Sequence, residues 1–132
     1  MKKNILFVCK YNRFRSKIAE AAFRKFNKNK NFKAKSAGMI RGFPISKDII
    51  EEAKNNGLKV IGKPQGISVD LLKQSNLVVI VADDVPREIF PKKYVENLIV
   101  WKIRDVNNDK ETINSIIQLI EKNVIELIKK LK

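Results

Sequence analysis

Short apolar runs alternate with helical patterns along the whole of this 132-residue chain. The run from Asn76 to Ala82 contains no charged residue, which is typical of a strand buried on both faces of a parallel sheet. Strand patterns also occur at residues 5–9, 32–36 and 98–103. The alternation predicts an α/β fold, in which helices cover both faces of one parallel sheet through right-handed crossovers.

Helical patterns fill the intervals between these strands. Ser46 and Ser68 are suitable N-caps, and Gly57 is a suitable stop for the helix that Ser46 begins. An apolar stripe along the C-terminal helix predicts core packing rather than a partner surface. The expected helices cover residues 16–26, 47–56, 69–74 and 110–131, with a shorter helical turn between 85 and 90, and the stripe comprises Ile113, Ile116, Ile117, Ile120, Val124, Leu127, Ile128 and Leu131.

The composition limits the chemistry that is open to the chain. A hydrophobic content of 44% is enough for one core, so residues 1–132 are expected to form a single domain. One cysteine and no histidine exclude a disulfide scaffold, a Cys/His zinc site and any Ser-His or Cys-His nucleophile pair. Apolar runs are too short to cross a membrane, and the N-terminus leads into the first strand without a signal peptide. We therefore expect a cytoplasmic protein with no membrane partner, whose thiol stays reduced.

The strong positive charge suggests an affinity for anions. The formal net charge is +14, but 22 of the 28 basic residues are lysines spread along the chain, with no dense basic run interleaved with aromatic residues. This pattern favours a solvated, lysine-rich surface over a specific nucleic-acid site. We expect the positive electrostatic field of the protein to attract anionic substrates and to cause weak adsorption to polyanions.

Polar residues that could do chemistry follow the predicted strands. Ligands of parallel α/β sheets bind outside the carboxyl ends of the strands, so these residues should meet at one edge. They are the segment from Cys9 to Ser16 after the first strand, Ser36 after the second, Asp83 and Asp84 after the third, and Asp105 after the fourth.

The cysteine lies in the turn between the first strand and the first helix. Such a turn directs backbone N–H groups inward and adds the positive end of the helix dipole, which favours a bound oxyanion and a thiolate. Arg15 would donate a planar pair of N–H groups to two phosphoryl oxygens, and Ser16 a hydroxyl to the sulfur. The alternative is a structural cysteine that ends a core strand, because free cysteine is among the most buried residue types.

A phosphoryl transfer from a thiolate also needs an acid to protonate the leaving oxygen. Asp105 fits by position, and the alternative is that it caps the final helix. Asn108 and Asp109 are closer to the start of that helix and are better placed to cap it. Asp83 and Asp84 are weaker candidates for the acid, because they could simply cap the following turn.

These residues resemble the signature of the low-molecular-weight protein tyrosine phosphatases, and the likeness extends over nearly the whole chain. The resemblance rests on Val8-Cys9, Asn12, Arg15-Ser16 and Ile18-Ala19-Glu20, and also on Ser36-Ala37-Gly38, the loop 57–65 and Asp105. It implies a three-layer α/β/α sandwich with a four-stranded parallel sheet, a phosphocysteine intermediate, and neither metal nor cofactor. The implied substrate is a phosphorylated protein or a small phosphomonoester, and we expect a monomer.

The resemblance also implies a role for each site residue. Cys9 would be the nucleophile, Arg15 the phosphate clamp, and Asp105 the acid and then the base. Ser16 would donate a hydrogen bond to the thiolate, and Asn12 would shape the loop, held by Ser36. The remaining members of the phosphate loop are Lys10, Tyr11, Arg13 and Phe14.

The chain departs from the family pattern at three places. Asp105 is followed by Val106, Asn107 and Asn108 rather than by proline and tyrosines, so aryl stacking from that side is lost and phosphotyrosine specificity is open. Tyr11 stands where glycine is common, so the backbone there must avoid strain. Phe14 stands where many members carry a second cysteine, which excludes a protective disulfide with Cys9.

Two other functions remain open at this point. The loop from Cys9 to Arg15 also resembles that of thioredoxin-coupled arsenate reductases, but those enzymes use further cysteines, so arsenate reduction here would need an external thiol. The other alternative is a non-catalytic protein that binds ligands at its phosphate site. Cys9, Arg15 and Asp105 together argue against lost catalysis, whereas Val106 leaves it open.

Overall fold

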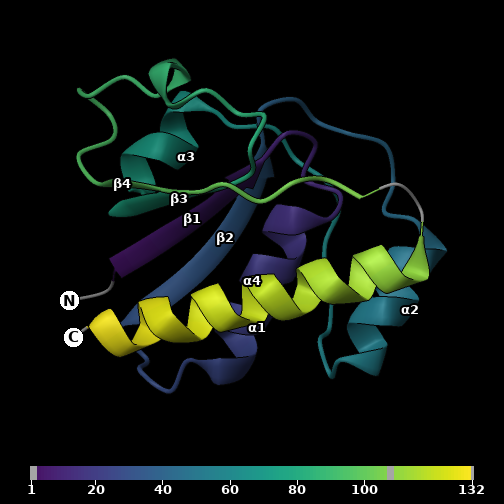
Figure 1. The fold of residues 1–132 in the computed structure, drawn as a ribbon. Coiled ribbons are helices and arrows are strands. Elements are labelled where there is room, and N and C mark those ends of the chain that lie inside the picture. Colours follow the sequence, from purple (N-terminus) through teal and green to yellow (C-terminus); the bar gives the residue numbers. More distant parts are fainter. Residues whose placement is uncertain (1–2, 107–108, 132) are drawn as a thin grey trace.

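A computed structural model describes residues 3–106 and 109–131. Four strands alternate with helices along the chain, as Figure 1 shows. The strands are β1 (Lys3–Cys9), β2 (Phe32–Gly38), β3 (Leu77–Val81) and β4 (Leu98–Trp101). The helices are α1 (Arg15–Phe26), α2 (Lys47–Asn55), α3 (Val69–Gln74), the single 3₁₀ turn η1 (Arg87–Ile89) and α4 (Lys110–Lys130).

The strands form one parallel sheet in the order β2-β1-β3-β4. In the register, Phe7 of β1 pairs with Ser36 of β2 on one side and with Val79 of β3 on the other. All four carboxyl ends therefore lie at the same edge of the sheet. The prediction of an α/β fold with a four-stranded parallel sheet is confirmed.

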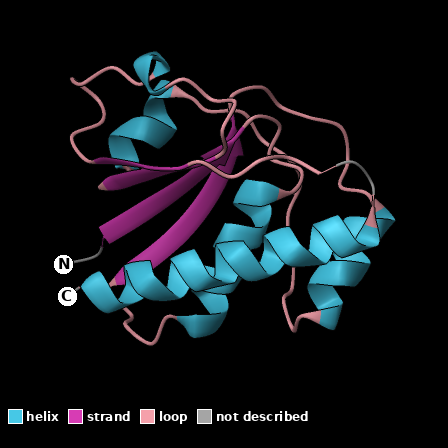
Figure 2. Ribbon diagram, in the orientation of Figure 1, coloured by secondary structure: helices cyan, strands magenta, loops and turns pink. Residues whose placement is uncertain are grey.

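Helices cover both faces of the sheet and make three layers (Figure 2). Alternate side chains of β1 face opposite ways: Phe7 packs with α1 and α4, whereas Leu6 packs with the smaller layer that contains α3. The stripe on α4 faces the larger layer, since its members from Ile113 to Leu127 are buried. The stripe is core packing, as its spacing predicts.

The helix ends follow the capping residues of the sequence. Ser46 accepts a hydrogen bond from the N–H of Ile49, and Ser68 accepts one from the N–H of Leu71. Asp109 caps α4 by accepting from the N–H of Glu111, so Asp105 is not that cap. Asn108, the other expected cap, lies outside the described residues.

All four strands differ in extent from the sequence prediction: β1 already begins at Lys3, and β3 covers only Leu77–Val81. β2 continues to Gly38, because a parallel bridge joins Gly38 to Gly66 as well as pairing it with Cys9. β4 ends at Trp101 rather than at Ile103, because the N–H of Ile103 turns back to the carbonyl of Trp101 at 2.9 Å. The segment that follows this turn places Asp105 beside Arg15, the first residue of α1. Among residues 3–106 and 109–131, no helix has the length and apolarity that a membrane span requires.

Candidate active site

The loop after β1 is held by hydrogen bonds between its carbonyl groups and the chain that follows β2. The carbonyls of three successive residues accept backbone N–H groups from the chain that follows β2, at 2.8 to 3.1 Å. With its carbonyls engaged on that side, the loop is free to direct N–H groups toward the start of α1, where an oxyanion is favoured. The pairs are Met39 with Cys9, Ile40 with Lys10, and Gly42 with Tyr11.

Two glycines allow this close approach. A Cβ on Gly38 would lie 2.8 Å from the backbone nitrogen of Asn12 and 2.5 Å from the carbonyl oxygen of Ile40. A Cβ on Gly42 would lie 2.7 Å from the carbonyl oxygen of Tyr11. Because backbone atoms cannot yield as a flexible side chain can, the segment after β2 supports the phosphate loop only with glycine at these positions.

A chain of directed hydrogen bonds leads to the cysteine sulfur. The N–H of Gln65 donates to Oδ1 of Asn12 at 2.9 Å, which leaves Nδ2 of Asn12 to donate to Oγ of Ser16 at 2.7 Å. The hydroxyl of Ser16 lies 3.0 Å from Sγ of Cys9. Because the Ser16 oxygen already accepts from Asn12, its proton is available to the sulfur. Ser16 therefore stands where the sequence predicts a donor to a thiolate.

Asn12 is also where the backbone of the loop turns. Its φ is 55°, in the left-handed region that asparagine tolerates better than most residues. Among the described residues it is the only non-glycine residue with positive φ, so Tyr11 needs no glycine-like conformation. The left-handed conformation falls on Asn12, one position after Tyr11, so the backbone at Tyr11 avoids the strain that the sequence raised as a possibility.

The expected contact between Ser36 and Asn12 is wrong. The hydroxyl of Ser36 donates to Oε1 of Glu20 at 2.6 Å, and its carbonyl accepts from Nε2 of Gln65 at 2.8 Å. Gln65 thus contacts both residues and connects them. The hydroxyl of Ser36 binds the carboxylate of Glu20 on α1 instead of Asn12. Ser36 therefore supports Asn12 only indirectly, through Gln65.

Arg15 is fully buried and points at the loops after β3 and β4. Its Nη1 donates to the carbonyl of Ile103 at 2.9 Å and lies 3.5 Å from a carboxylate oxygen of Asp83. Its Nη2 lies 3.0 Å from Asp84 and 3.6 Å from Asp105. One cation therefore faces three carboxylates that are each about one-third to one-half exposed.

Sequence reasoning missed the contact of Asp83 and Asp84 with this arginine. The available signal was the order of the strands, because β3 neighbours β1 and its carboxyl end opens beside the start of α1. When the strand order is not known, a pair of aspartates after an apolar run is equally consistent with a cap of the following turn. The structure assigns them to the buried guanidinium.

Cys9, Arg15 and Asp105 line one small cavity of about 70 Å³ at the carboxyl edge of the sheet. The sequence predicted that these three residues would meet, and the structure brings them together. Asp105 is held by the N–H of Val106, which donates to its Oδ1 at 2.9 Å. The other lining residues are Tyr11, Arg13, Phe14, Ser46, Ile49 and Val106.

Three of the predicted loop residues, Lys10, Asn12 and Ser16, do not line this cavity. Lys10 is half-buried with its ammonium 5.3 Å from the centre of the Tyr11 ring, and Asn12 and Ser16 act on the sulfur from behind. Arg13 lines the cavity, yet its guanidinium donates to the carbonyls of Phe43 and Pro44. Its charge is thus partly used to hold the loop before α2.

A buried lysine fixes the loop that carries Gln65. The side chain of Lys17 is 5% exposed, and its ammonium donates to the carbonyl of Ile61 at 3.1 Å and lies 3.9 Å from Glu20. Burial lowers the pKa of Lys17 from the ordinary 10.5, and the nearby Glu20 opposes that shift. Lys17 connects α1 to the same loop whose Gln65 orients Asn12.

Among the residues that the structure describes, no group of three or more His, Cys, Asp or Glu side chains is arranged to hold a metal ion. The aspartates around Arg15 are arranged about the guanidinium instead.

The fold and site define a three-layer α/β protein with one cysteine in the turn between β1 and α1. The family model of the low molecular weight phosphotyrosine protein phosphatases matches residues 4–132. The chain therefore belongs to this family, as the sequence motifs predict. Among curated proteins, no sequence matches the chain significantly.

Solved structures of several activities share the fold. A low molecular weight protein tyrosine phosphatase from T. tengcongensis has 25% identity and a TM-score of 0.88, covering 98% of this chain and 100% of its own. An arsenate reductase from Archaeoglobus fulgidus has 27% identity and a TM-score of 0.80, with 95% and 98% covered. The YwlE arginine phosphatase from Geobacillus stearothermophilus has 20% identity and a TM-score of 0.85, with 97% and 92% covered, which shows a common fold alone.

Burial of Lys17 predicts a pH dependence of stability. Because its folded-state pKa lies below 10.5, the unfolded chain binds the proton more tightly, and the cost of burying the charge fades as pH rises through the folded-state pKa. Relative to Lys17→Met, the wild type should gain free energy of unfolding as the pH rises from neutral toward the ordinary lysine pKa of 10.5. Urea denaturation of both proteins across this range measures the difference. A difference that stays constant or shrinks would show that Lys17 is not desolvated.

Proposed function

We propose that this protein is a cysteine-dependent phosphomonoester hydrolase that acts through a phosphocysteine intermediate. The observation that carries the proposal is the common cavity of Cys9, Arg15 and Asp105, with Ser16 behind the sulfur at 3.0 Å. A thiolate, a cation and an acid are the groups that phosphoryl transfer to sulfur needs. The lone thiol is best kept reduced in the cytoplasm, where we place the reaction.

In the first step, Sγ of Cys9 attacks the phosphorus atom and the bond from phosphorus to the ester oxygen breaks. Asp105 gives its proton to that departing oxygen, and the phosphoryl group remains on sulfur. In the second step, Asp105 takes a proton from a water molecule that attacks the phosphorus. The bond from phosphorus to sulfur then breaks, and inorganic phosphate and the Cys9 thiolate are released.

The charges around Arg15 support this division of roles. Asp83 and Asp84 hold the guanidinium from the side of β3, so its position does not depend on the substrate. Asp105 lies 3.6 Å from the same guanidinium and lines the cavity together with Cys9, so its carboxyl group is within reach of an ester bound there.

The walls of the cavity suit an aryl ester. Tyr11, Ile49 and Val106 line it together with the catalytic groups, and they offer an apolar surface to the group that carries the phosphate. We therefore infer a protein phosphotyrosine or a small aryl phosphate as substrate. The likeness to the tyrosine phosphatase from T. tengcongensis, at 25% identity, supports this choice.

Arsenate reduction is the second candidate. The likeness to the arsenate reductase from Archaeoglobus fulgidus, at 27% identity, favours it. Cys9 is the only cysteine of the chain, so the electrons would have to come from an external thiol. A phosphate-binding protein without turnover is the third candidate, and it would bind phosphate at the same cavity.

The proposal predicts hydrolysis of 4-nitrophenyl phosphate that is insensitive to chelators and depends on Cys9. Cys9→Ser should abolish turnover, and Arg15→Lys should lower it by orders of magnitude, because lysine keeps the charge but not the paired N–H donors. Hydrolysis is measured by the release of nitrophenol. A parallel assay measures the arsenate-dependent oxidation of an external thiol. Reduction of arsenate without ester hydrolysis would favour the second candidate, and phosphate binding without either reaction would favour the third.

Asp105 is distinguished from its neighbours by the leaving group. In the first step, measured as the rapid release of the alcohol before steady state, Asp105→Asn should slow phenyl phosphate by about a hundred- to ten-thousandfold and the nitrophenyl ester far less, because only the more basic oxygen needs a proton. Asp83→Asn and Asp84→Asn are the matched variants, and they should slow both esters alike because they act on Arg15. If one of these two variants showed the leaving-group dependence instead, the acid would be wrongly assigned.

A further inference from the structure

A second and larger hollow lies at the opposite edge of the sheet from Cys9. Its lining includes the first residues of the strands, among them Lys3, Phe32, Leu77 and Leu98, whereas the catalytic cavity lies at the carboxyl ends. Its volume is about 1260 Å³, which is large enough for an extended ligand. The site described above uses none of the residues that line it, and we call it the amino-edge groove.

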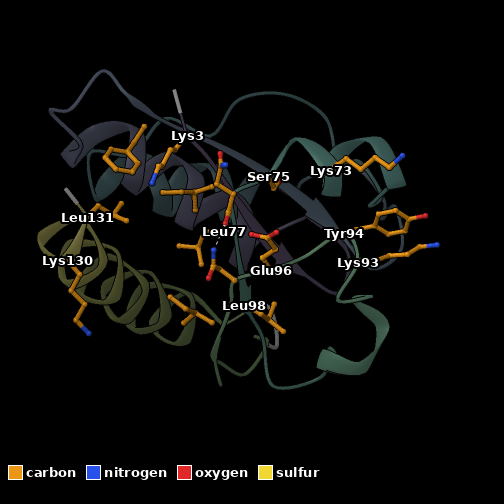
Figure 3. Close-up of a pocket in the computed structure, with 15 residues that line it drawn as sticks. Lys3, Lys73, Ser75, Leu77, Lys93, Tyr94, Glu96, Leu98, Lys130 and Leu131 are labelled. Carbon is orange, nitrogen blue, oxygen red and sulfur yellow. Dashed lines mark hydrogen bonds between the residues drawn. The ribbon is translucent and has the colours of Figure 1, made fainter. Parts of the chain in front are cut away.

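The groove has lysines toward both ends and aliphatic side chains between them. Figure 3 shows Lys3 and Lys130 on one side and Lys73 and Lys93 on the other, with Leu77 between the two groups. These four lysines are exposed, and Glu96 is the one acidic residue among the described residues of the lining. The lining therefore carries four positive charges against one negative charge, which complements an acidic ligand.

At one end the charges are concentrated around a single aromatic ring. The ammonium of Lys73 lies 5.5 Å and that of Lys93 lies 4.9 Å from the centre of the Tyr94 ring. These two residues come from α3 and from the loop before β4, so the ring gathers cations from separate segments. A carboxylate placed beside Tyr94 would meet both ammonium groups.

We propose that the amino-edge groove binds an extended acidic segment of a protein partner, with carboxylates at both ends and an aliphatic side chain between them. The carboxylates would pair with Lys3 and Lys130 at one end and with Lys73 and Lys93 at the other. The aliphatic side chain would lie on the half-buried Leu77 and its apolar neighbours. This binding does not depend on the chemistry at Cys9.

The lining favours a polypeptide over a nucleic acid. No arginine lines the groove, so the paired donors that match a phosphate are absent from this part of the described chain. The ring of Tyr94 has two ammonium groups over it and is not free to stack on a base. The remaining apolar surface is largely aliphatic, which suits leucine or isoleucine.

The test uses a short fluorescein-labelled peptide in which glutamates flank a Leu-Ile pair, titrated with the full-length protein at physiological salt. Lys73→Gln combined with Lys93→Gln should raise the Kd by roughly two- to thirtyfold, since each removes an exposed ion pair. A peptide with serines in place of Leu-Ile should bind at least about tenfold more weakly, because the buried apolar area is lost. Hydrolysis of nitrophenyl phosphate, or the circular dichroism spectrum, confirms that the variant is folded.

The matched control is Lys54→Gln combined with Lys122→Gln, which removes the same charge from exposed positions on α2 and α4. It should leave the Kd within about twofold of the wild type, because distant surface charges are screened. Equal weakening by both double variants would show attraction to net charge alone and would overturn the proposal. Absence of peptide binding would do the same. A single-stranded oligonucleotide that bound more tightly than the peptide, and lost affinity in the Lys73 and Lys93 double variant, would also overturn the proposal and would assign the groove to nucleic acid.

Discussion

The side-chain amide of Asn12 connects the scaffold to the sulfur of Cys9 through Ser16. One end accepts the N–H of Gln65 from the loop before α3, and the other end donates to Ser16, which lies against Cys9. The same residue takes the left-handed backbone conformation that turns the loop toward α1. Because an amide has distinct donor and acceptor ends, the direction of every hydrogen bond in this series is fixed, and the hydroxyl of Ser16 is left to face the sulfur.

Supports of this loop come from three separate parts of the chain. The carbonyls of the loop accept N–H groups from the segment after β2, and Gly38 and Gly42 make that approach possible. Arg15 is held from the other side by aspartates after β3 and β4. Each support lies at the carboxyl edge of a strand, so the parallel sheet is what brings them together. The amino edge carries an unrelated, lysine-rich groove.

The sequence predicted the elements and the central site because their signals are local. Apolar runs identified the strands, serines identified two helix starts, and the spacing from Cys9 to Arg15 identified the turn whose residues line the small cavity. It failed where a contact depends on side chains that are distant in sequence: Ser36 pairs with Glu20 instead of Asn12, and Asp84 pairs with Arg15. Such partners depend on the order of the strands and on which polar groups lie close together once the core is buried. Neither can be inferred from a fixed spacing of residues in the sequence.

A covalent phosphoryl group on Cys9 is the central claim of this account, and its capture is the most direct test. Asp105→Asn should still accept the phosphoryl group from 4-nitrophenyl phosphate, because that leaving group needs no proton, yet it should hydrolyse the intermediate slowly. Rapid quenching followed by peptide mass spectrometry should then find one phosphoryl group on the peptide that contains Cys9. Release of nitrophenol by this variant with Cys9 unmodified, or with the phosphoryl group on another residue, would contradict the account.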